Sequence, residues 1–163
     1  MRIYQMPTFQ MAIKKIQMYK RIKAMDQVEE YHEIFEELED RFGDLPIETE
    51  RLLKIARMKV WGLNAGVMSV KEKQKIITIL LSEEGTANVD GGKIVEQSMK
   101  FERAVGFGMD NMQLKLTIDE RKCGKYLPFD ILEELMQMIS NAKKTTLKDK
   151  LIVSYHRITI SFF

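Results

Sequence analysis

The stretch DRFGDLP, residues 40–46, decides the fold of the first part of the chain. Gly43 can adopt the left-handed backbone conformation that commonly closes a helix. Pro46 is tolerated in the first turn of a following helix, where the N–H it lacks would be unpaired anyway. The stretch therefore predicts a corner between two helices, with Phe42 and Leu45 buried. The residues assigned to this structural motif are Arg41, Phe42, Gly43, Leu45 and Pro46.

Helical periodicity continues on both sides of the corner. A helix is predicted over residues 27–42, with Asp26 as its cap and Glu29 reaching back in a capping box. A preceding helix is predicted over residues 9–24, and the helix after the corner should end near 62–66. Their core-facing residues are expected to include Ile16 and Tyr19, then Val28, Tyr31, Ile34, Phe35 and Leu38, then Leu52, Leu53, Ile55, Ala56 and Val60.

The second half of the chain changes character. Residues 75–81 are short and β-branched, and residues 112–118 alternate apolar and polar side chains, which is typical of strands. Between them we expect a loop over 83–92 and a short helical or irregular piece over 93–101. Gly106, Phe107 and Gly108 suggest a tight turn, and Pro128 opens a last helix that reaches about Lys144.

These elements indicate an α+β fold, with an N-terminal three-helix segment followed by a small sheet and a C-terminal helix. We expect one domain over residues 1–163. Residues 1–10 and 151–163 are expected to be peripheral or not native to the domain. The apolar, β-branched residues 151–163 could also form an edge strand.

Composition limits the function classes. Hydrophobic residues make up 45% and charged residues 31% of the 163 residues, which suits a soluble domain with its own core. One cysteine allows no intramolecular disulfide and fits the reducing cytoplasm, and no apolar run is long enough to span a membrane. The net charge is +2, but charges of opposite sign are segregated along the chain. The net charge is +6 over residues 1–25, −10 over 26–50 and +6 over 51–75.

Residues that could carry catalysis are few. His32 and His156 do not share a metal-ligand spacing, and the dipeptide Glu133-Glu134 cannot form a poised acid–base pair on a helix. Cys123 lies beside Arg121 and Lys122, which could lower its pKa, but no companion base is identifiable. The chain carries no phosphate loop of the Walker type. We therefore expect a non-catalytic domain without a metal or cofactor.

Three segments resemble a known family. KIQMYKRI at residues 15–22, DRFGDLP at 40–46 and LLKIARMK at 52–59 are similar to the C-terminal domain of bacterial transcription-repair coupling factors, at matching spacing over residues 13–66. The resemblance implies a regulatory clamp that docks on the N-terminal repair-protein-binding domain of the same protein and masks it. The parent is then an ATP-driven DNA translocase that engages RNA polymerase, double-stranded DNA and the excision-repair damage-recognition protein, with no membrane partner.

Four carboxylates of the second helix, Glu30, Glu33, Glu37 and Asp40, recur at steps of three, four and three residues. We call this row the acidic stripe. The resemblance implies that Glu37 and Asp40, supported by Glu33, pair with arginines of the repair-protein-binding domain. The residues alone equally allow a solvated face balanced by the neighbouring basic helices.

The runner-up function is an accessory DNA-binding module. It would use the basic residues that precede and follow the acidic helix. These are Lys14, Lys15, Lys20, Arg21, Lys23, Arg51, Lys54, Arg57 and Lys59. A steep dependence of DNA affinity on salt would distinguish this function from protein docking.

Overall fold

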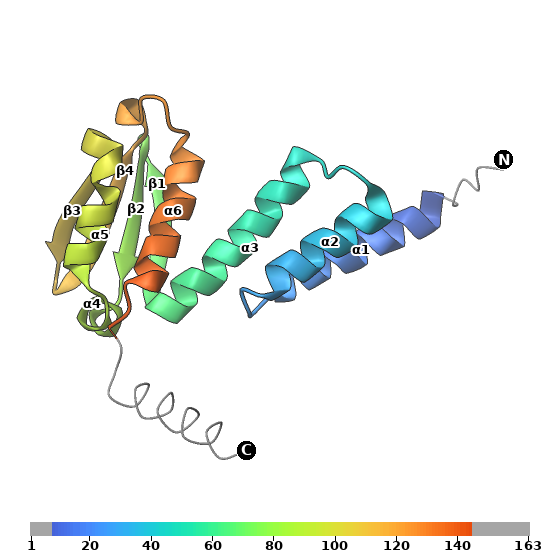
Figure 1. Cartoon of the computed structure of the whole chain (residues 1–163), viewed down its shortest axis with the longest axis horizontal. Coiled ribbons are helices and arrows are strands. Elements are labelled where there is room, and N and C mark those ends of the chain that lie inside the picture. The colour runs from blue at the N-terminus through green and yellow to red at the C-terminus, as the bar shows by residue number, and fades with distance from the viewer. Residues whose placement is uncertain (1–7, 145–163) are drawn as a thin grey trace, which may run out of the picture. The chain divides into compact units, whose positions relative to one another are not determined.

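The structure is a computed structural model that describes residues 8–144, with side chains from residue 16 onward. The chain divides into two compact units at Asn64–Ala65, a helical unit (residues 1–64) and a sheet unit (residues 65–163). The helical unit is built from α1 (Thr8–Ala24), α2 (Glu30–Phe42) and α3 (Ile47–Ala65), whose last residue begins the sheet unit. The elements are labelled in Figure 1.

The core of the helical unit lies among its three helices. Ile22 of α1, Ile34 of α2 and Leu53 of α3 are at most 1% exposed. Tyr31 and Phe35 of α2 pack against this core and stay half-buried. The other buried members of the cluster are Met18, Met25, Leu38, Ala56 and Val60.

The predicted inner faces of two helices are partly wrong. Among the α1 side chains that the structure describes, Met18 and Ile22 are buried, as is Met25 directly after the helix, while Ile16 and Tyr19 are exposed. Flexible methionine side chains fill this seam, and they weaken a pattern that is read from β-branched and aromatic residues. In α3, Ile55 is exposed although it was expected in the core. Leu53, Ala56 and Val60 are the α3 residues that enter the helical core, and Ile55 lies on another side of the helix.

The start of α2 also differs from the prediction. The helix begins at Glu30, and Glu29 caps it without a side-chain hydrogen bond. Instead Glu30 Oε1 accepts hydrogen bonds from the backbone N–H groups of Gln27 (3.0 Å) and Asp26 (3.3 Å). The carboxylate that reaches back is therefore one residue later than expected, because the chain bends at residues 27–28 before the first turn.

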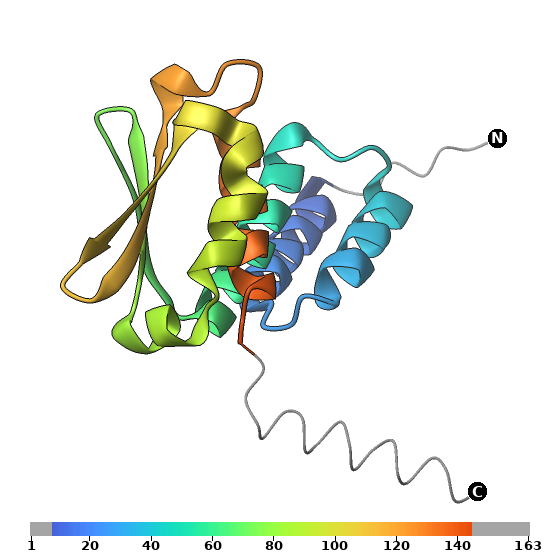
Figure 2. The same ribbon diagram turned by 60° about the vertical axis from the view of Figure 1, so that its left-hand side comes forward.

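The sheet unit is a four-stranded antiparallel sheet of order β1-β2-β4-β3. Its strands are β1 (Val67–Lys73), β2 (Ile76–Leu81), β3 (Val105–Asp110) and β4 (Gln113–Asp119). Its helices are α4 (Glu83–Asn88), α5 (Gly91–Ser98), the 3-10 helices η1 (Met99–Ala104) and η2 (Glu120–Lys122), and α6 (Pro128–Asn141). Both α5 and α6 lie on one side of the sheet (Figures 1 and 2).

The core of the sheet unit fills the space between that sheet face and the two helices. Ile79 of β2 pairs with Leu116 of β4, and both are fully buried. From the helices, Ile94 of α5 and Leu135 of α6 are fully buried as well. Alternation along β2, in which every second residue is buried, is the pattern expected when one sheet face is covered.

The structure confirms the α+β class and the two predicted strands, which are β2 and β4. It adds β1 and β3, which were missed. The loop expected over 83–92 is wrong, since α4 and the start of α5 occupy it. The turn expected at Gly106–Gly108 is also wrong. These residues lie within β3, and the turn falls at Asn111–Met112.

The last predicted helix is confirmed as α6, although it ends at Asn141. The expectations for residues 151–163, and for all but residues 8–10 of the segment 1–10, lie outside the described residues. Within residues 8–144, no helix combines the length and apolar character needed to cross a bilayer.

Candidate docking surface on the second helix

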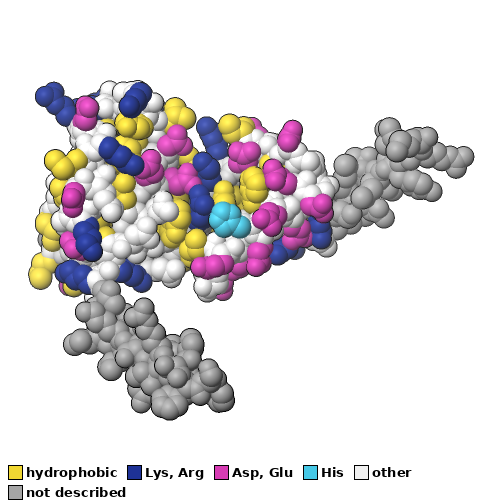
Figure 3. Space-filling view, in the orientation of Figure 1, with side chains coloured by type: hydrophobic (Ala, Val, Ile, Leu, Met, Phe, Trp, Pro, Cys, Tyr) yellow, Lys and Arg dark blue, Asp and Glu magenta, His cyan; other side chains and the backbone are white. Residues whose placement is uncertain are grey.

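The acidic stripe runs along one side of α2, next to the buried face of the helix. Ile34 and Leu38 are buried, whereas Glu33 and Asp40 are exposed and Glu30 and Glu37 are half-buried. Acidic side chains gather over the helical unit in the space-filling view (Figure 3). The structure therefore brings the four predicted carboxylates onto one side of one helix, as their spacing requires.

Two members of the stripe are held within the unit. Glu37 forms ion pairs with Arg21 of α1 and, at 2.7 Å, with Arg41 one turn later on α2. Glu30 accepts the two backbone hydrogen bonds already described. The N–H of Gln27, followed by that of Asp26, holds the pKa of Glu30 below its usual range. Glu30 and Glu37 therefore serve the fold of the helical unit.

The other two members, Glu33 and Asp40, present free carboxylates. Within residues 16–144 neither has an ion-pair partner. Their charges are therefore available to an external cation. The spacing of Glu37 and Arg41 could have revealed their pair from sequence, because residues four apart meet on a helix. The contribution of Arg21, sixteen residues away, had no such signal.

The corner at residues 40–46 joins α2 to α3 as predicted. Gly43 has φ +74° and ψ −152°, and its N–H donates to the carbonyl of Glu39 at 2.8 Å. The carbonyl of Pro46 accepts from the N–H groups of Thr49 (2.8 Å) and Glu50 (3.2 Å), which starts α3. A glycine is required here, because this combination of φ and ψ is essentially restricted to glycine.

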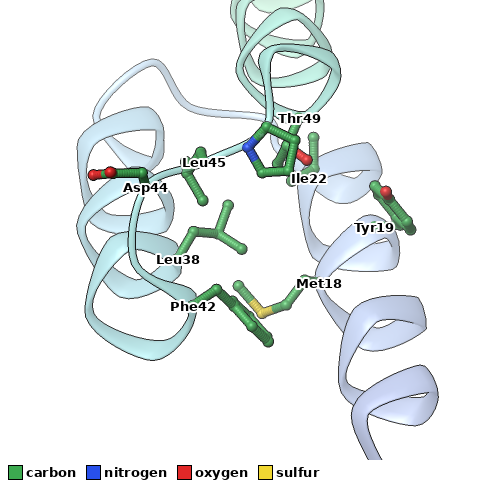
Figure 4. A pocket seen from close by; sticks show the side chains of 9 residues that line it. Met18, Tyr19, Ile22, Leu38, Phe42, Asp44, Leu45 and Thr49 are labelled. Atoms are coloured by element: carbon green, nitrogen blue, oxygen red, sulfur yellow. The ribbon is translucent and has the colours of Figure 1, made fainter. Parts of the chain in front are cut away.

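The predicted burial of the corner side chains is wrong for Phe42 and only partly right for Leu45. Phe42 is 39% exposed, and Leu45 is half-buried. Both line an apolar groove of about 270 Å³ at the corner, so their outer surfaces face this opening. The remaining lining residues are Met18, Tyr19, Ile22, Leu38, Asp44, Pro46 and Thr49. In Figure 4, Met18, Leu38 and Phe42 point toward one another, while Asp44 points away.

The basic residues of the alternative DNA-binding function are distributed unevenly. Arg21 pairs with Glu37, and the Arg57 guanidinium lies 3.9 Å from the ring centre of Tyr31 and 4.8 Å from that of Trp61. Both arginines therefore contribute to the helical unit itself. Lys20, Lys23 and Lys59 are exposed, Arg51 and Lys54 take part in further interactions, and the side chains of Lys14 and Lys15 lie outside the described part.

Cys123 is packed inside the sheet unit. Its Sγ lies 3.4 Å from the carbonyl oxygen of Asp119, to which the thiol donates. Burial raises the pKa of the Cys123 thiol, and the charges of Glu120 and Asp119 raise it further. The neighbouring cations Arg121 and Lys122 instead bind the Asp119 carboxylate at 2.8 and 3.0 Å. The thiol is therefore kept in its protonated, unreactive form.

The other candidate groups are also engaged in ordinary contacts. His32 meets the ring of Tyr31 edge-on at 5.2 Å, and Glu134 pairs with Lys100. Among residues 8–144, no three His, Cys, Asp or Glu side chains are grouped so that they could hold a metal ion. The surface of α2 and the adjoining corner therefore form the site with the clearest capacity for binding.

Comparisons with known proteins agree on one family. The family model of the TRCF domain matches residues 10–91. The transcription-repair-coupling factor of Bacillus subtilis strain 168 is 32% identical over 134 residues, 82% of this chain and 11% of that protein. A Staphylococcus epidermidis protein of the same name is 38% identical over 108 residues, 66% of this chain and 9% of that protein.

This chain thus spans about a tenth of the length of these relatives. A crystal structure of the C-terminal domain of a transcription-repair coupling factor matches it with a TM-score of 0.67, at 24% identity and over 84% of both chains. At that identity the match establishes a shared fold.

Proposed function

The chain belongs to the TRCF domain family, and we propose that it acts as a regulatory docking domain of a transcription-repair coupling factor. It binds reversibly to the N-terminal repair-protein-binding domain of its parent protein and masks that domain until the parent's ATP-driven motor acts on stalled RNA polymerase. The chain itself contributes binding and no chemistry. The parent engages double-stranded DNA and the excision-repair damage-recognition protein in the cytoplasm.

The observation that carries this proposal is the division of the acidic stripe. Glu37 is already neutralised by two arginines, whereas Asp40 and Glu33 are exposed without an ion pair among the described residues. Like charges three and four residues apart repel one another on a helix, so an uncompensated row has a cost when the domain stands alone. An arginine-bearing partner would remove that cost. Asp40, with Glu33 in support, is proposed to meet it directly, and Glu37 would join them by exchanging Arg21 or Arg41 for an arginine of the partner.

The groove at the corner supports the same surface. Phe42 and Tyr19 line it and expose 39% and 37% of their surface, and Asp40 lies two residues before Phe42 on α2. Interfaces commonly combine an apolar centre with charges at the rim, which steer association and set register. A partner that presents arginine beside an apolar side chain would satisfy both features.

Asp40 offers the cleanest test of this proposal, because Glu37→Ala would also break contacts inside the helical unit. We expect Asp40→Ala to weaken binding of the chain to the parent's N-terminal domain. Removing one member of a desolvated charge pair costs about 2 kcal/mol or more, which corresponds to about thirtyfold in affinity. Titration calorimetry measures this directly. Glu39→Ala, an exposed carboxylate on α2 outside the stripe, is the matched control and should bind as the wild type does.

In the full-length parent, we expect the same variant to gain affinity for a repair protein. If docking masks the repair-protein-binding domain, Asp40→Ala should increase binding of the damage-recognition protein. Equal binding by wild type, Asp40→Ala and Asp40→Ala with Glu33→Ala, in chains with unchanged melting, would reject the docking role of the stripe.

A further inference from the structure

The two edges of the four-stranded sheet differ in how they are protected. The edge strand β1 has an irregular register between Val67 and Ser69 and then exposes Lys71, Glu72 and Lys73. Bulges and charged side chains, lysine above all, are the features that keep natural edge strands from pairing with other chains. The β1 edge is therefore closed to strand addition.

The opposite edge, β3, has none of these features along residues 105–109. Phe107 is 38% and Met109 63% exposed, and they pair with Leu116 and Leu114 of β4 in an unbroken register. Within residues 8–144 no strand pairs with the outer side of β3, which ends the sheet order (Figures 1 and 2). Hydrophobic side chains appear at this margin of the sheet unit in Figure 3. The β3 edge thus combines unpaired backbone groups with apolar side chains.

The other face of β3 is open at residues 106 and 108, which are both glycine, and its next side chain is that of Asp110 at the end of the strand. Gly106 and Gly108 alternate with Phe107 and lie opposite Thr117 and Lys115 of β4. A Cβ placed on Gly108 would meet nothing within 4 Å. No β3 side chain therefore separates the half-buried Lys115 from the edge.

Lys115 sets the charge that an added strand should carry. Among the described residues it has no ion-pair partner. A strand added beside β3 would lie about 4.8 Å from β3, and so roughly 10 Å from β4. A lysine and a glutamate reaching over Gly108 together span that separation. An acidic residue at the position beside Gly108 would therefore complement Lys115.

We propose that the β3 edge binds an extended segment of a partner protein as a fifth strand of the sheet. The segment has apolar side chains on the face of Phe107 and Met109, and acidic side chains on the face of Lys115. Backbone hydrogen bonds to β3 supply affinity, and the alternation of apolar and acidic residues supplies specificity. This site lies in the sheet unit and is independent of docking by α2.

The test uses the whole 163-residue chain and a fluorescein-labelled peptide in which valine and glutamate alternate three times. We expect saturable binding by fluorescence anisotropy. Amide chemical-shift changes in the ¹⁵N spectrum should centre on Val105–Asp110, with none over Val67–Lys73. Phe107→Lys, which gives β3 the protection that β1 has, should weaken binding more than tenfold. Met109→Lys serves as a second variant if Phe107→Lys does not fold.

Lys115→Gln should weaken binding about twofold to fivefold, as expected for the loss of a partly exposed ion pair. Its matched control, Lys71→Gln at the other edge, should leave the affinity unchanged. The proposal is overturned if a valine–lysine peptide or an N-methylated valine–glutamate peptide binds as tightly. Sedimentation of the chain alone as a dimer that Phe107→Lys dissociates would also overturn it, because the occupant would then be a second copy.

Discussion

Among residues 16–144, three large side chains of the helical unit are less than 2% exposed, namely Ile22, Ile34 and Leu53. The sheet unit has eight over the same range: Ile79, Leu81, Ile94, Leu116, Ile118, Ile131, Leu135 and Ile139. The helical core also opens at the corner, where Ile22 and Leu38 line the groove. A core that already borders a cavity can relax around a lost side chain more easily than a closed one. The two units should therefore respond differently to the same chemical change.

The largest effect is expected from truncating the closed core. Leu116→Ala should lower the free energy of unfolding of the sheet unit by about 3–4 kcal/mol, whereas Leu38→Ala should cost the helical unit about 2 kcal/mol. Hydrogen exchange of the sheet-unit amides measures the change in unfolding free energy for Leu116→Ala. Fluorescence of Trp61, the single tryptophan, reports on the helical unit in denaturant titrations of the second. Equal costs would show that the groove gives the helical core no freedom to relax.

The next effect comes from a contact between two glycines in the sheet unit. A Cβ on Gly85 would lie 2.8 Å from the carbonyl oxygen of Gly66 and 2.9 Å from that of Ala65, and backbone atoms cannot move aside cheaply. Gly85→Ala should therefore cost about 2 kcal/mol by overpacking. Gly91→Ala, which meets no atom within 4 Å, is the control and should not destabilise. A melting temperature unchanged by both substitutions would mean that the backbone at Gly66 yields.

Gly43 provides the corresponding test in the helical unit. Its Cβ would meet nothing within 4 Å, so only the backbone conformation opposes a side chain there. Gly43→Val should cost about 1 kcal/mol or more. Asparagine should not rescue the position, since ψ −152° lies outside the left-handed helical region that asparagine tolerates. Full stability of Gly43→Asn, measured by thermal unfolding, would contradict this account of the corner.

The sequence predicted the helical unit better than the sheet unit, and the turns explain why. The residues Gln74–Lys75 and Asn111–Met112 form two-residue connections in which both residues have positive φ. Such hairpin turns usually contain Asn-Gly or Asp-Gly, so neither pair signals a hairpin. Gly106 and Gly108 also make β3 hard to predict, since glycine is depleted in strands. A strand held by its neighbours rather than by its own propensity is not visible in one sequence.

The candidate site shows a similar limit. The spacing of the acidic residues correctly placed four carboxylates on one side of α2, because helical geometry fixes that relation. Which of them are free depends on Arg21, brought to Glu37 by the packing of α1 against α2. The exposure of Phe42 likewise depends on the groove between segments far apart in sequence. The pairing of the carboxylates and the exposure of Phe42 both arise from tertiary packing. The periodicity of the sequence therefore could not predict them.

The smallest effect separates the two halves of the stripe. Glu37→Gln should lower the stability of the helical unit by roughly 0.5 kcal/mol, because Arg21 and Arg41 are about half exposed and such pairs are screened by water and salt. Asp40→Asn should be neutral or slightly stabilising, since it removes a charge that lacks a partner among the described residues and reduces repulsion along α2. Thermal unfolding of both variants at low and high salt measures the difference.

The difference should shrink as salt rises, because salt screens both the attraction between Glu37 and its arginines and the repulsion between Asp40 and the other carboxylates of α2. If Asp40→Asn destabilises the unit as much as Glu37→Gln does, then Asp40 has a structural partner and is not held free for docking. If instead Glu37→Gln has no effect on stability, the ion pairs of Glu37 with Arg21 and Arg41 do not stabilise the fold, and a partner's arginine could replace them. The docking surface would then include Glu37 on equal terms with Asp40, since an external arginine could replace Arg21 at no cost to the fold.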